Sequence, residues 1–302
     1  MASFTLHATS PFRLDLTVWA LRRLPTNAVD LWDGRTYQRV HVLGETPVAV
    51  AVEQKEPPEA TELRVRTPEK RMNARLRSTI AAVLGKTLGL DADLGPFYRL
   101  AAADKRLGPL VGRFAGLKPP RLPTVFEALV NAFACQQLSL NVGIALLNRL
   151  CTAYGRAAGG QTAFPSPQDL AEARSADLRK LGYSGRKAEC ILWLARRIAD
   201  GEQDLEALAE LDDAAAFSRL IALPGVGRWS AQYVMLRSLG RLNVIPVDDV
   251  GMQSNLQRWL KLKERPDADA LRRRLAPWHP YGGMLYFHLL LDHLMRGGIV
   301  KL

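Results

Sequence analysis

"LPGVGRWSAQYVMLRSLGRLNVIPVDDVGMQ", Leu223 to Gln253, is the stretch of sequence that decides the fold. It begins with a Pro-Gly-x-Gly turn between apolar flanks and ends with two adjacent aspartates in an otherwise apolar run. The segments on either side of the turn have helical spacing of apolar residues, which predicts helices over 207–222 and 228–239. The stretch therefore predicts a tight hairpin between two helices, followed by a short connection to a third.

The two glycines of this turn, Gly225 and Gly227, are suited to binding a phosphate group. They leave the backbone N–H groups open to close approach, and the N-terminal end of the second helix favours a negative charge. An isolated Gly-x-Gly is more often an ordinary helix–helix turn that uses left-handed backbone angles. The complete string Leu-Pro-Gly-Val-Gly-Arg-x-Ser-Ala is more specific, and it favours the phosphate-binding interpretation.

The charge of the chain also indicates a polyanionic partner. The 302 residues contain 41 Lys and Arg against 30 Asp and Glu, a net charge of +11. A basic protein of this size is a candidate for binding nucleic acid, although a solvated, arginine-rich surface would give the same count. Two arginine clusters, 64–77 and 271–275, favour the first interpretation, but either is equally compatible with a solvated helix face.

Several classes of protein are disfavoured by the composition. The longest apolar runs, such as Met284–Leu291, are too short to span a membrane. The first residues show no basic segment followed by an apolar one, so we expect a cytoplasmic protein, in a bacterium associated with the nucleoid. Three scattered cysteines argue against disulfides and against a cluster of metal-bound thiolates. The five histidines show no ligand spacing, so we expect no metal site.

The chain divides into two regions of different periodicity. The first ~70 residues contain period-two segments typical of strands, with a turn at 44–47 between two of them and an amphipathic helix over 12–24. From Lys70 onward the pattern is helical, and short Gly and Pro breaks separate eight or more segments. We therefore predict an α+β protein, with a small antiparallel sheet followed by a mostly helical core.

One helix start is predicted in detail. Thr124 precedes an apolar helical segment, and Glu127 follows three residues later. This spacing is that of a capping box, in which the threonine hydroxyl and the glutamate carboxylate each accept a hydrogen bond from the other residue's backbone N–H.

Four segments together resemble a known family. The hairpin LPGVGRWSAQYV and the following VIPVDDVG are similar to the helix-hairpin-helix and the aspartate segment of the HhH-GPD superfamily of DNA glycosylases. NAFACQQLSL (131–140) and the segment 178–201 also fit. The α/β region before them resembles the branch called 3-methyladenine DNA glycosylase II, or AlkA, in which a domain similar to half of the TATA-binding protein precedes the helical core.

This resemblance implies a domain organisation. Residues 1–98 are expected to form the small mixed α/β domain, and residues 99–302 the helical glycosylase core. Within the core we expect two helical subdomains with the active-site cleft between them. One comprises roughly 125–240, and the other 99–124 together with 241–302.

The resemblance also implies the catalytic residue. Loss of a base from DNA passes through an oxocarbenium-like sugar, which a nearby carboxylate stabilises, and the superfamily supplies one aspartate for this. Alignment with the AlkA branch places this role on Asp249, with Asp248 as its neighbour that caps the helix starting near Val250. Two carboxylates at a helix N-terminus also fit simple capping, and other branches place the aspartate directly after Pro-Val. Which of the two aspartates acts therefore stays open.

Trp229 indicates which chemistry to expect. In one branch of the superfamily that also cleaves the strand, the residue at this position is a lysine that attacks the sugar. Trp229 cannot form an imine, so the resemblance implies a monofunctional enzyme that uses water. Its aromatic face would stack on a cationic base. Tyr233, four residues later, shares its helix face, and Phe287 and Trp19 are the other expected pocket walls.

The remaining implied roles concern double-stranded DNA containing damaged bases. The base must leave the duplex to reach a pocket, and in the family a residue of the 135–138 turn fills the gap. Here Gln137 takes this wedge position, with Leu138 beside it. Phosphates would be held by Gly225, Gly227 and Arg228. No cofactor is needed for catalysis, but a monovalent cation is expected on the hairpin carbonyls when DNA is bound.

The predicted function is thus a monomeric, monofunctional DNA glycosylase of base excision repair. It would flip out and hydrolyse alkylated purines of the 3-methyladenine and 7-methylguanine type, leaving an abasic site. Two alternatives remain open: a glycosylase for oxidised or deaminated purines, with or without lyase activity, and a non-catalytic protein that binds damaged DNA. Lysines elsewhere, such as Lys187, are potential nucleophiles for a lyase.

Overall fold

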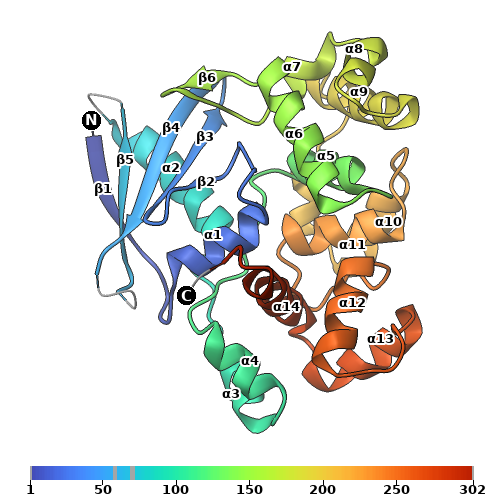
Figure 1. Cartoon of the computed structure of the whole chain (residues 1–302). Coiled ribbons are helices and arrows are strands. Elements are labelled where there is room, and N and C mark those ends of the chain that lie inside the picture. The colour runs from blue at the N-terminus through green and yellow to red at the C-terminus, as the bar shows by residue number, and fades with distance from the viewer. Residues whose placement is uncertain (1, 57–59, 69–71, 301–302) are drawn as a thin grey trace.

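A five-stranded antiparallel sheet forms the N-terminal part of the molecule in the computed structural model, which describes residues 2–56, 60–68 and 72–300 (Figure 1). The strand order is β1-β5-β4-β3-β2. The strands are β1 (Ala2–His7), β2 (Leu31–Trp32), β3 (Thr36–Leu43), β4 (Thr46–Gln54) and β5 (Glu62–Thr67). The hairpin predicted at 44–47 joins β3 to β4, with Leu43 opposite Thr46 and Gly44 at a positive φ of 64°. The predicted sheet is therefore confirmed.

The helices follow the predicted order. The described residues contain fourteen α-helices, and thirteen of them come after the sheet. They are α1 (Leu14–Arg22), α2 (Ala74–Leu88), α3 (Gly95–Ala103), α4 (Leu107–Arg113), α5 (Val125–Cys135), α6 (Leu140–Tyr154), α7 (Pro167–Ala171), α8 (Ser175–Lys180), α9 (Gly185–Ala199), α10 (Asp213–Ile221), α11 (Arg228–Arg237), α12 (Val250–Trp259), α13 (Ala268–Leu275) and α14 (Gly282–Arg296). The α+β class predicted from periodicity is confirmed.

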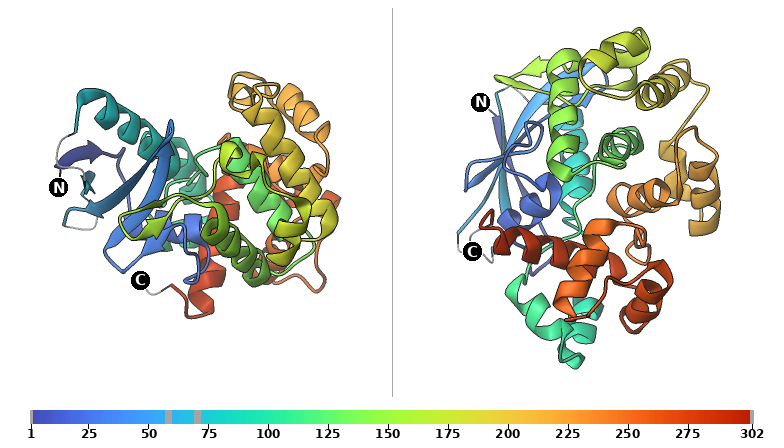
Figure 2. Two further views of the ribbon diagram at one scale, coloured as in Figure 1. Left: turned by 90° about the horizontal axis from the view of Figure 1, so that it is seen from above. Right: turned by 45° about the vertical axis from the view of Figure 1, so that its right-hand side comes forward.

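The apolar side chains form two separate buried clusters. The larger cluster joins the sheet and α2 to α5, α6, α9 and α11. The smaller one joins α3, α4, α12, α13 and α14. Helix α1 contributes residues to both, for example Leu14 to the first and Leu16 to the second. In Figures 1 and 2 the sheet lies at one side of the molecule and α8 to α13 at the other. The exact domain boundaries stay a prediction.

Three local expectations were wrong. The helix expected over 207–222 is split into a short 3-10 turn (Glu206–Glu210) and α10. Two additional short strands, β6 (Ala157–Ala158) and β7 (Gln161–Thr162), form a second small hairpin in a region predicted as helical. Thr124 caps α5 by accepting the N–H of Glu127 at 3.1 Å, but the Glu127 side chain does not complete a capping box. The basic run 64–77 lies partly outside the described residues.

Glu127 instead joins the helical core to the sheet. Arg39 of β3 donates one hydrogen bond to Glu127 at 2.5 Å and another to Asp30 at 2.7 Å, and all three side chains are buried. Tyr37 also donates to Asp30 at 2.9 Å. Burial raises the pKa of Glu127, and the nearby Arg39 only partly opposes this rise. A buried carboxylate needs such a partner, so its contact with the sheet replaced the local capping role.

Candidate active site

The hairpin between α10 and α11 has the geometry that its glycines require. Gly225 adopts a left-handed φ of 77°, and a Cβ atom there would lie 2.6 Å from Sγ of Cys190 on α9. Only glycine fits this position without displacement. Gly227 is the N-cap of α11, and a Cβ atom on it would meet nothing within 4 Å. The first glycine thus permits close packing, whereas the second leaves the start of α11 open to an approaching group.

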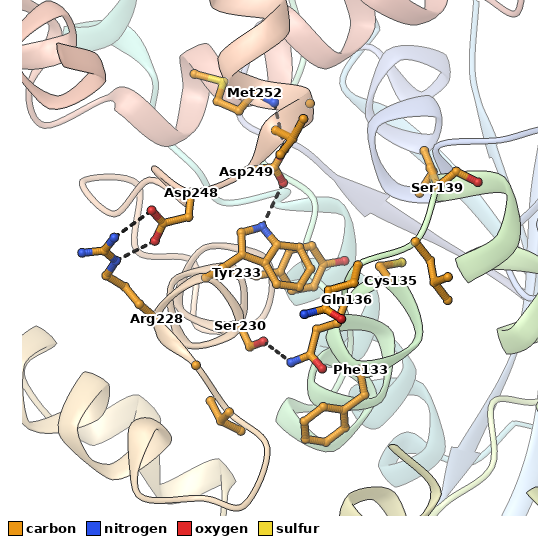
Figure 3. A pocket seen from close by; sticks show the side chains of 18 of the residues that line it. Phe133, Cys135, Gln136, Ser139, Arg228, Ser230, Tyr233, Asp248, Asp249 and Met252 are labelled. Carbon is orange, nitrogen blue, oxygen red and sulfur yellow. Dashed lines mark hydrogen bonds and ion pairs between the residues drawn. The ribbon is translucent and has the colours of Figure 1, made fainter. Parts of the chain in front are cut away.

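Asp249 is held by two donors. It is the N-cap of α12, where Oδ1 accepts the backbone N–H of Met252 at 2.8 Å. Its other oxygen, Oδ2, accepts the indole N–H of Trp229 at 3.1 Å (Figure 3). The capping role expected for Asp248 was therefore wrong, because the cap is Asp249 itself. These contacts fix the carboxylate between the end of the hairpin and the start of α12.

Asp248 has a different partner. Its carboxylate accepts two hydrogen bonds from Arg228, at 2.5 Å from Nε and 2.7 Å from Nη2 (Figure 3). The Asp248 carboxylate raises the pKa of Arg228. The guanidinium that was expected to hold a phosphate is thus occupied by a carboxylate in this structure. The two adjacent aspartates therefore contact different residues of α11: Asp248 contacts Arg228, and Asp249 contacts Trp229.

Trp229 and Tyr233 form an aromatic wall beside Asp249. Both belong to α11, and their ring centroids lie 5.4 Å apart with an interplanar angle of 30°. The spacing of four residues places them on one face of the helix, as expected. Tyr233 is 2% exposed, and Trp229 is partly buried. A flat ring system lying against this wall would reach Asp249 at its edge.

These groups line one cavity of about 1530 Å³. The cavity is enclosed by the C-terminal end of α1, the end of α5 with its turn to α6, the start of α9, the hairpin, the start of α12, and α14. The predicted residues that line it are Gln137, Leu138, Gly225, Gly227, Arg228, Trp229, Tyr233 and Asp249. The cavity is large enough for a nucleotide-sized ligand.

Two predicted wall residues do not line this cavity. Phe287 is fully buried in the smaller apolar cluster, and the guanidinium of Arg237 lies 5.2 Å from its ring centroid. Trp19 packs at the edge of the same cluster, with Arg22 4.9 Å above its ring. Tyr286, the neighbour of Phe287, lines the cavity instead. Adjacent helical residues point about 100° apart, so a shift of one position exchanges a core residue for a wall residue.

The turn between α5 and α6 carries the residues expected to enter DNA. Gln137 is exposed and has a positive φ of 56°, which is uncommon for a residue with a side chain. Leu138 is 44% exposed. Gln136 anchors this turn to the hairpin, because its Nε2 donates to the Gly225 carbonyl at 3.0 Å and to Ser230 Oγ at 2.8 Å (Figure 3). Lys187 donates to the Gln136 carbonyl at 2.7 Å.

The sequence reasoning missed Arg23 as a cavity residue. Arg23 follows α1 and lines the cavity, although it lies far from the other lining residues in the sequence. Its Nη1 donates to the Tyr233 hydroxyl at 3.1 Å, and its Nη2 donates to Asn131 Oδ1 at 2.6 Å. No sequence signal separated it from Arg22, because the two arginines are adjacent in one helical segment.

The described residues contain neither a metal-binding cluster nor a membrane-spanning helix. Within residues 2–56, 60–68 and 72–300, no group of three or more His, Cys, Asp or Glu side chains is arranged to hold a metal ion. Over the same residues, every helix is too short or too polar to cross a membrane.

A helix-hairpin-helix joined to a carboxylate in an aromatic cavity defines a class of DNA repair protein, and the comparisons agree. The HhH-GPD superfamily base excision DNA repair protein model matches residues 130–280. The chain belongs to this superfamily. The match includes the hairpin, Asp249 and the 135–138 turn, but it excludes Arg23.

Two relatives and one solved structure show which members of the superfamily this chain is similar to. A DNA-3-methyladenine glycosylase of Bacillus subtilis is 30% identical over 70% of this chain and 72% of its own length. YfjP of the same organism is 33% identical over 52% of this chain, and the match spans 55% of that relative's length. Among solved structures, a 3-methyladenine DNA-glycosylase from Archaeoglobus fulgidus has a TM-score of 0.84 and 26% identity. That match covers 98% of this chain and 100% of the other.

Proposed function

We propose that this protein is a monofunctional DNA glycosylase that excises alkylated purines from double-stranded DNA and leaves an abasic site. The observation that carries the proposal is the placement of Asp249. Its carboxylate lies beside the aromatic wall of Trp229 and Tyr233, in a cavity that adjoins the hairpin. The named activity of the Bacillus subtilis and Archaeoglobus fulgidus relatives supports the same substrate class.

The chemistry follows from the charge of the substrate. A purine alkylated at N3 or N7 carries a positive charge, so it can leave without a general acid. The sugar then develops oxocarbenium character, and the ionised Asp249 stabilises that charge. A cationic base stacks favourably on the Trp229 and Tyr233 rings. Water captures the sugar carbon, and no metal or cofactor takes part in this proposal.

DNA would be held by backbone groups and by charge. The backbone N–H groups of Gly225 and Gly227 would bind a phosphate at the start of α11, where a Cβ atom on Gly227 would meet nothing within 4 Å. Gln137 and Leu138 are exposed and line the cavity, and they would fill the space left by the flipped base. Of the hairpin carbonyls that would bind a monovalent cation, the one of Gly225 accepts a hydrogen bond from Gln136. This hydrogen bond occupies one of the two lone pairs of that oxygen, so the other stays available to the cation.

A lyase is the second candidate, and Lys187 is the observation behind it. Lys187 lines the same cavity, and burial lowers the pKa of its amine, which increases the neutral, nucleophilic fraction. Its Nζ is, however, hydrogen-bonded to the Gln136 carbonyl. Trp229 occupies the position where the resemblance places a lyase lysine. We therefore favour attack by water.

Base release from methylated duplex DNA, analysed by chromatography, tests the proposal. The wild type should release methylated purines, and Asp249→Asn should lower the rate by at least about a hundredfold, because it removes the transition-state charge. Asparagine caps helices as well as aspartate does, so the fold should persist. Asp248→Asn is the matched control and should retain the activity. Unchanged release by Asp249→Asn would contradict the catalytic assignment.

Borohydride reduction separates the two candidates. A monofunctional enzyme forms no imine with the abasic sugar, so no covalent protein–DNA adduct should appear. An adduct that forms with the wild type and is lost in Lys187→Met would instead establish the lyase.

A further inference from the structure

Arg23 is a buried cation in the cavity wall. It is 5% exposed and adopts a left-handed φ of 65°, which is unfavourable for a residue with a side chain. Its backbone N–H donates to the Trp19 carbonyl at 3.0 Å, and this contact closes the end of α1. The neighbouring Arg22 points elsewhere and donates to the carbonyls of Trp32 and Pro25. Of these two adjacent arginines, only Arg23 lines the cavity.

The charge of Arg23 is not neutralised by an ion pair. Its two hydrogen-bond partners, Tyr233 and Asn131, are neutral groups. In the described part of the chain, the ion pairs of the nearby carboxylates Asp30 and Glu127 are with Arg39, and Arg23 forms none. Arginine keeps its charge in proteins. Nη1 and Nη2 each carry a second N–H beyond the one used in these two hydrogen bonds, so the cavity end formed by Arg23 suits a ligand that brings an acceptor.

The two ends of the aromatic cavity wall carry opposite charges. Asp249 contacts Trp229, Trp229 packs on Tyr233, and the Tyr233 hydroxyl contacts Arg23. One end of the aromatic wall is therefore a carboxylate and the other is a guanidinium. A purine that lies on this wall with its sugar carbon at Asp249 presents its opposite edge toward Arg23. In purines that edge carries the substituent at C6.

We infer that Arg23 makes the cavity prefer purines with a carbonyl oxygen at C6, as in guanine and hypoxanthine bases, over purines with an amino group there. The carbonyl accepts a hydrogen bond from a charged donor, whereas the amino group of an adenine base is itself a donor and meets a like group. This inference rests on the proposed glycosylase function and specifies its substrate choice. Arg23 is a specificity-determining residue in this scheme, and Asp249 remains the catalytic one.

Competing release of three bases tests this inference. The substrates are methylated duplex DNA, which yields 7-methylguanine and 3-methyladenine, and a duplex with a single hypoxanthine. The variant Arg23→Met removes the donor but keeps an unbranched side chain. Arg22→Met is the matched control, because it removes an equally buried arginine that does not line the cavity.

The deciding quantity is the ratio of hypoxanthine release to 3-methyladenine release. Arg23→Met should lower this ratio about tenfold, as expected for one hydrogen bond to a charged group, and should lower the 7-methylguanine ratio in the same direction. Arg22→Met should leave both ratios unchanged. A hypoxanthine ratio in Arg23→Met that stays within about threefold of the wild type, or that rises, overturns the inference.

A second variant keeps the inference testable if Arg23→Met does not fold. Asn131→Asp places a carboxylate at the position that now accepts from Arg23 at 2.6 Å, and thereby neutralises the guanidinium. It should lower the hypoxanthine ratio as well, and an unchanged ratio would overturn the inference. A wild type that releases none of the three bases overturns the proposed function together with this inference. A wild type that releases them, with ratios that Arg23→Met does not change, overturns the inference alone.

Discussion

The indole N–H of Trp229 donates a hydrogen bond to the carboxylate of Asp249 across 3.1 Å. The residue that provides the aromatic face therefore also orients the carboxylate that we propose to be catalytic. Because the second oxygen of Asp249 accepts the Met252 N–H, both carboxylate oxygens have a fixed donor. In the proposed mechanism, base stacking and charge stabilisation are thus coupled through the Trp229 side chain, and this coupling can be measured.

Trp229→Phe separates the two roles of the tryptophan. Phenylalanine keeps an aromatic face but cannot donate to Asp249, so the carboxylate loses one of its two donors. We expect single-turnover release of methylated purines to slow by about tenfold, the effect of losing one hydrogen bond to a charged group. Trp193→Phe, on α9 and outside the cavity, is the control. Release at the wild-type rate would show that the indole N–H does not contribute.

Asp248→Asn should strengthen binding to undamaged duplex DNA. The substitution removes a negative charge and releases Arg228 from its two hydrogen bonds, so that the guanidinium becomes available to a phosphate. We expect a several-fold lower Kd, and a plot of log K against log salt that is steeper by about one counterion. Titration by fluorescence anisotropy at several salt concentrations measures both. The double variant Asp248→Asn/Arg228→Ala should lose the gain, and a gain that persists would exclude Arg228 as its source.

Glu127→Ala should destabilise the whole protein. It leaves Arg39 buried with one carboxylate instead of two, and breaking a buried ion pair of this kind costs about 3 kcal/mol or more. Urea unfolding followed by circular dichroism gives the free energy of unfolding. Asp269→Ala removes an exposed ion pair with Arg272 and should change the stability little. Equal effects of the two substitutions would contradict the role assigned to Glu127.

The stability should also fall in mild acid because of two buried histidines. Burial, with a contribution from Arg39, lowers the pKa of His41 to about 3, and burial lowers that of His288 to about 4. An unfolded histidine binds its proton near pH 6.5. Between about pH 6.5 and 4 the unfolded state therefore binds protons that the folded state excludes, so stability decreases as the pH falls. The slope is at most about 1.4 kcal/mol per pH unit for each histidine.

Unfolding experiments at pH 7, 6 and 5 check this dependence. His41→Gln should reduce the slope, since it removes one of the two groups. His7→Gln, at an exposed position on β1, should leave the slope unchanged. A slope that His41→Gln does not alter would contradict the assignment.

The features that the sequence predicted well are those with a local signature. The period-two strands, the Gly225 turn and the four-residue spacing of Trp229 and Tyr233 depend on neighbouring residues, and each was found as expected. The family motif also covers the hairpin and the 135–138 turn, which line one cavity. The choice of Asp249 as the catalytic residue stays a prediction, although its contact with Trp229 supports it.

The features that the sequence did not predict depend on distant contacts. The carboxylate of Glu127 had a local use in a capping box, but Arg39, 88 positions away, provides a stronger partner. Helix periodicity could not decide between Tyr286 and Phe287, because the cavity and the core lie on adjacent faces of α14. Nothing in the sequence distinguished Arg22 from Arg23, since the direction of each side chain follows from the left-handed residue that ends α1.

Arg23 and Tyr233 are 210 positions apart in the chain, and their contact has a consequence for protein engineering. The inner wall of the cavity belongs partly to the sheet region, so a truncated version that begins after the sheet would lack its guanidinium. It would also leave Glu127 buried without Arg39. We therefore expect the helical part alone to be less stable and to lack the Arg23 guanidinium in its cavity. If Arg23 sets the preference inferred above, a chimera that exchanges the N-terminal region between two such enzymes would transfer part of that preference with it.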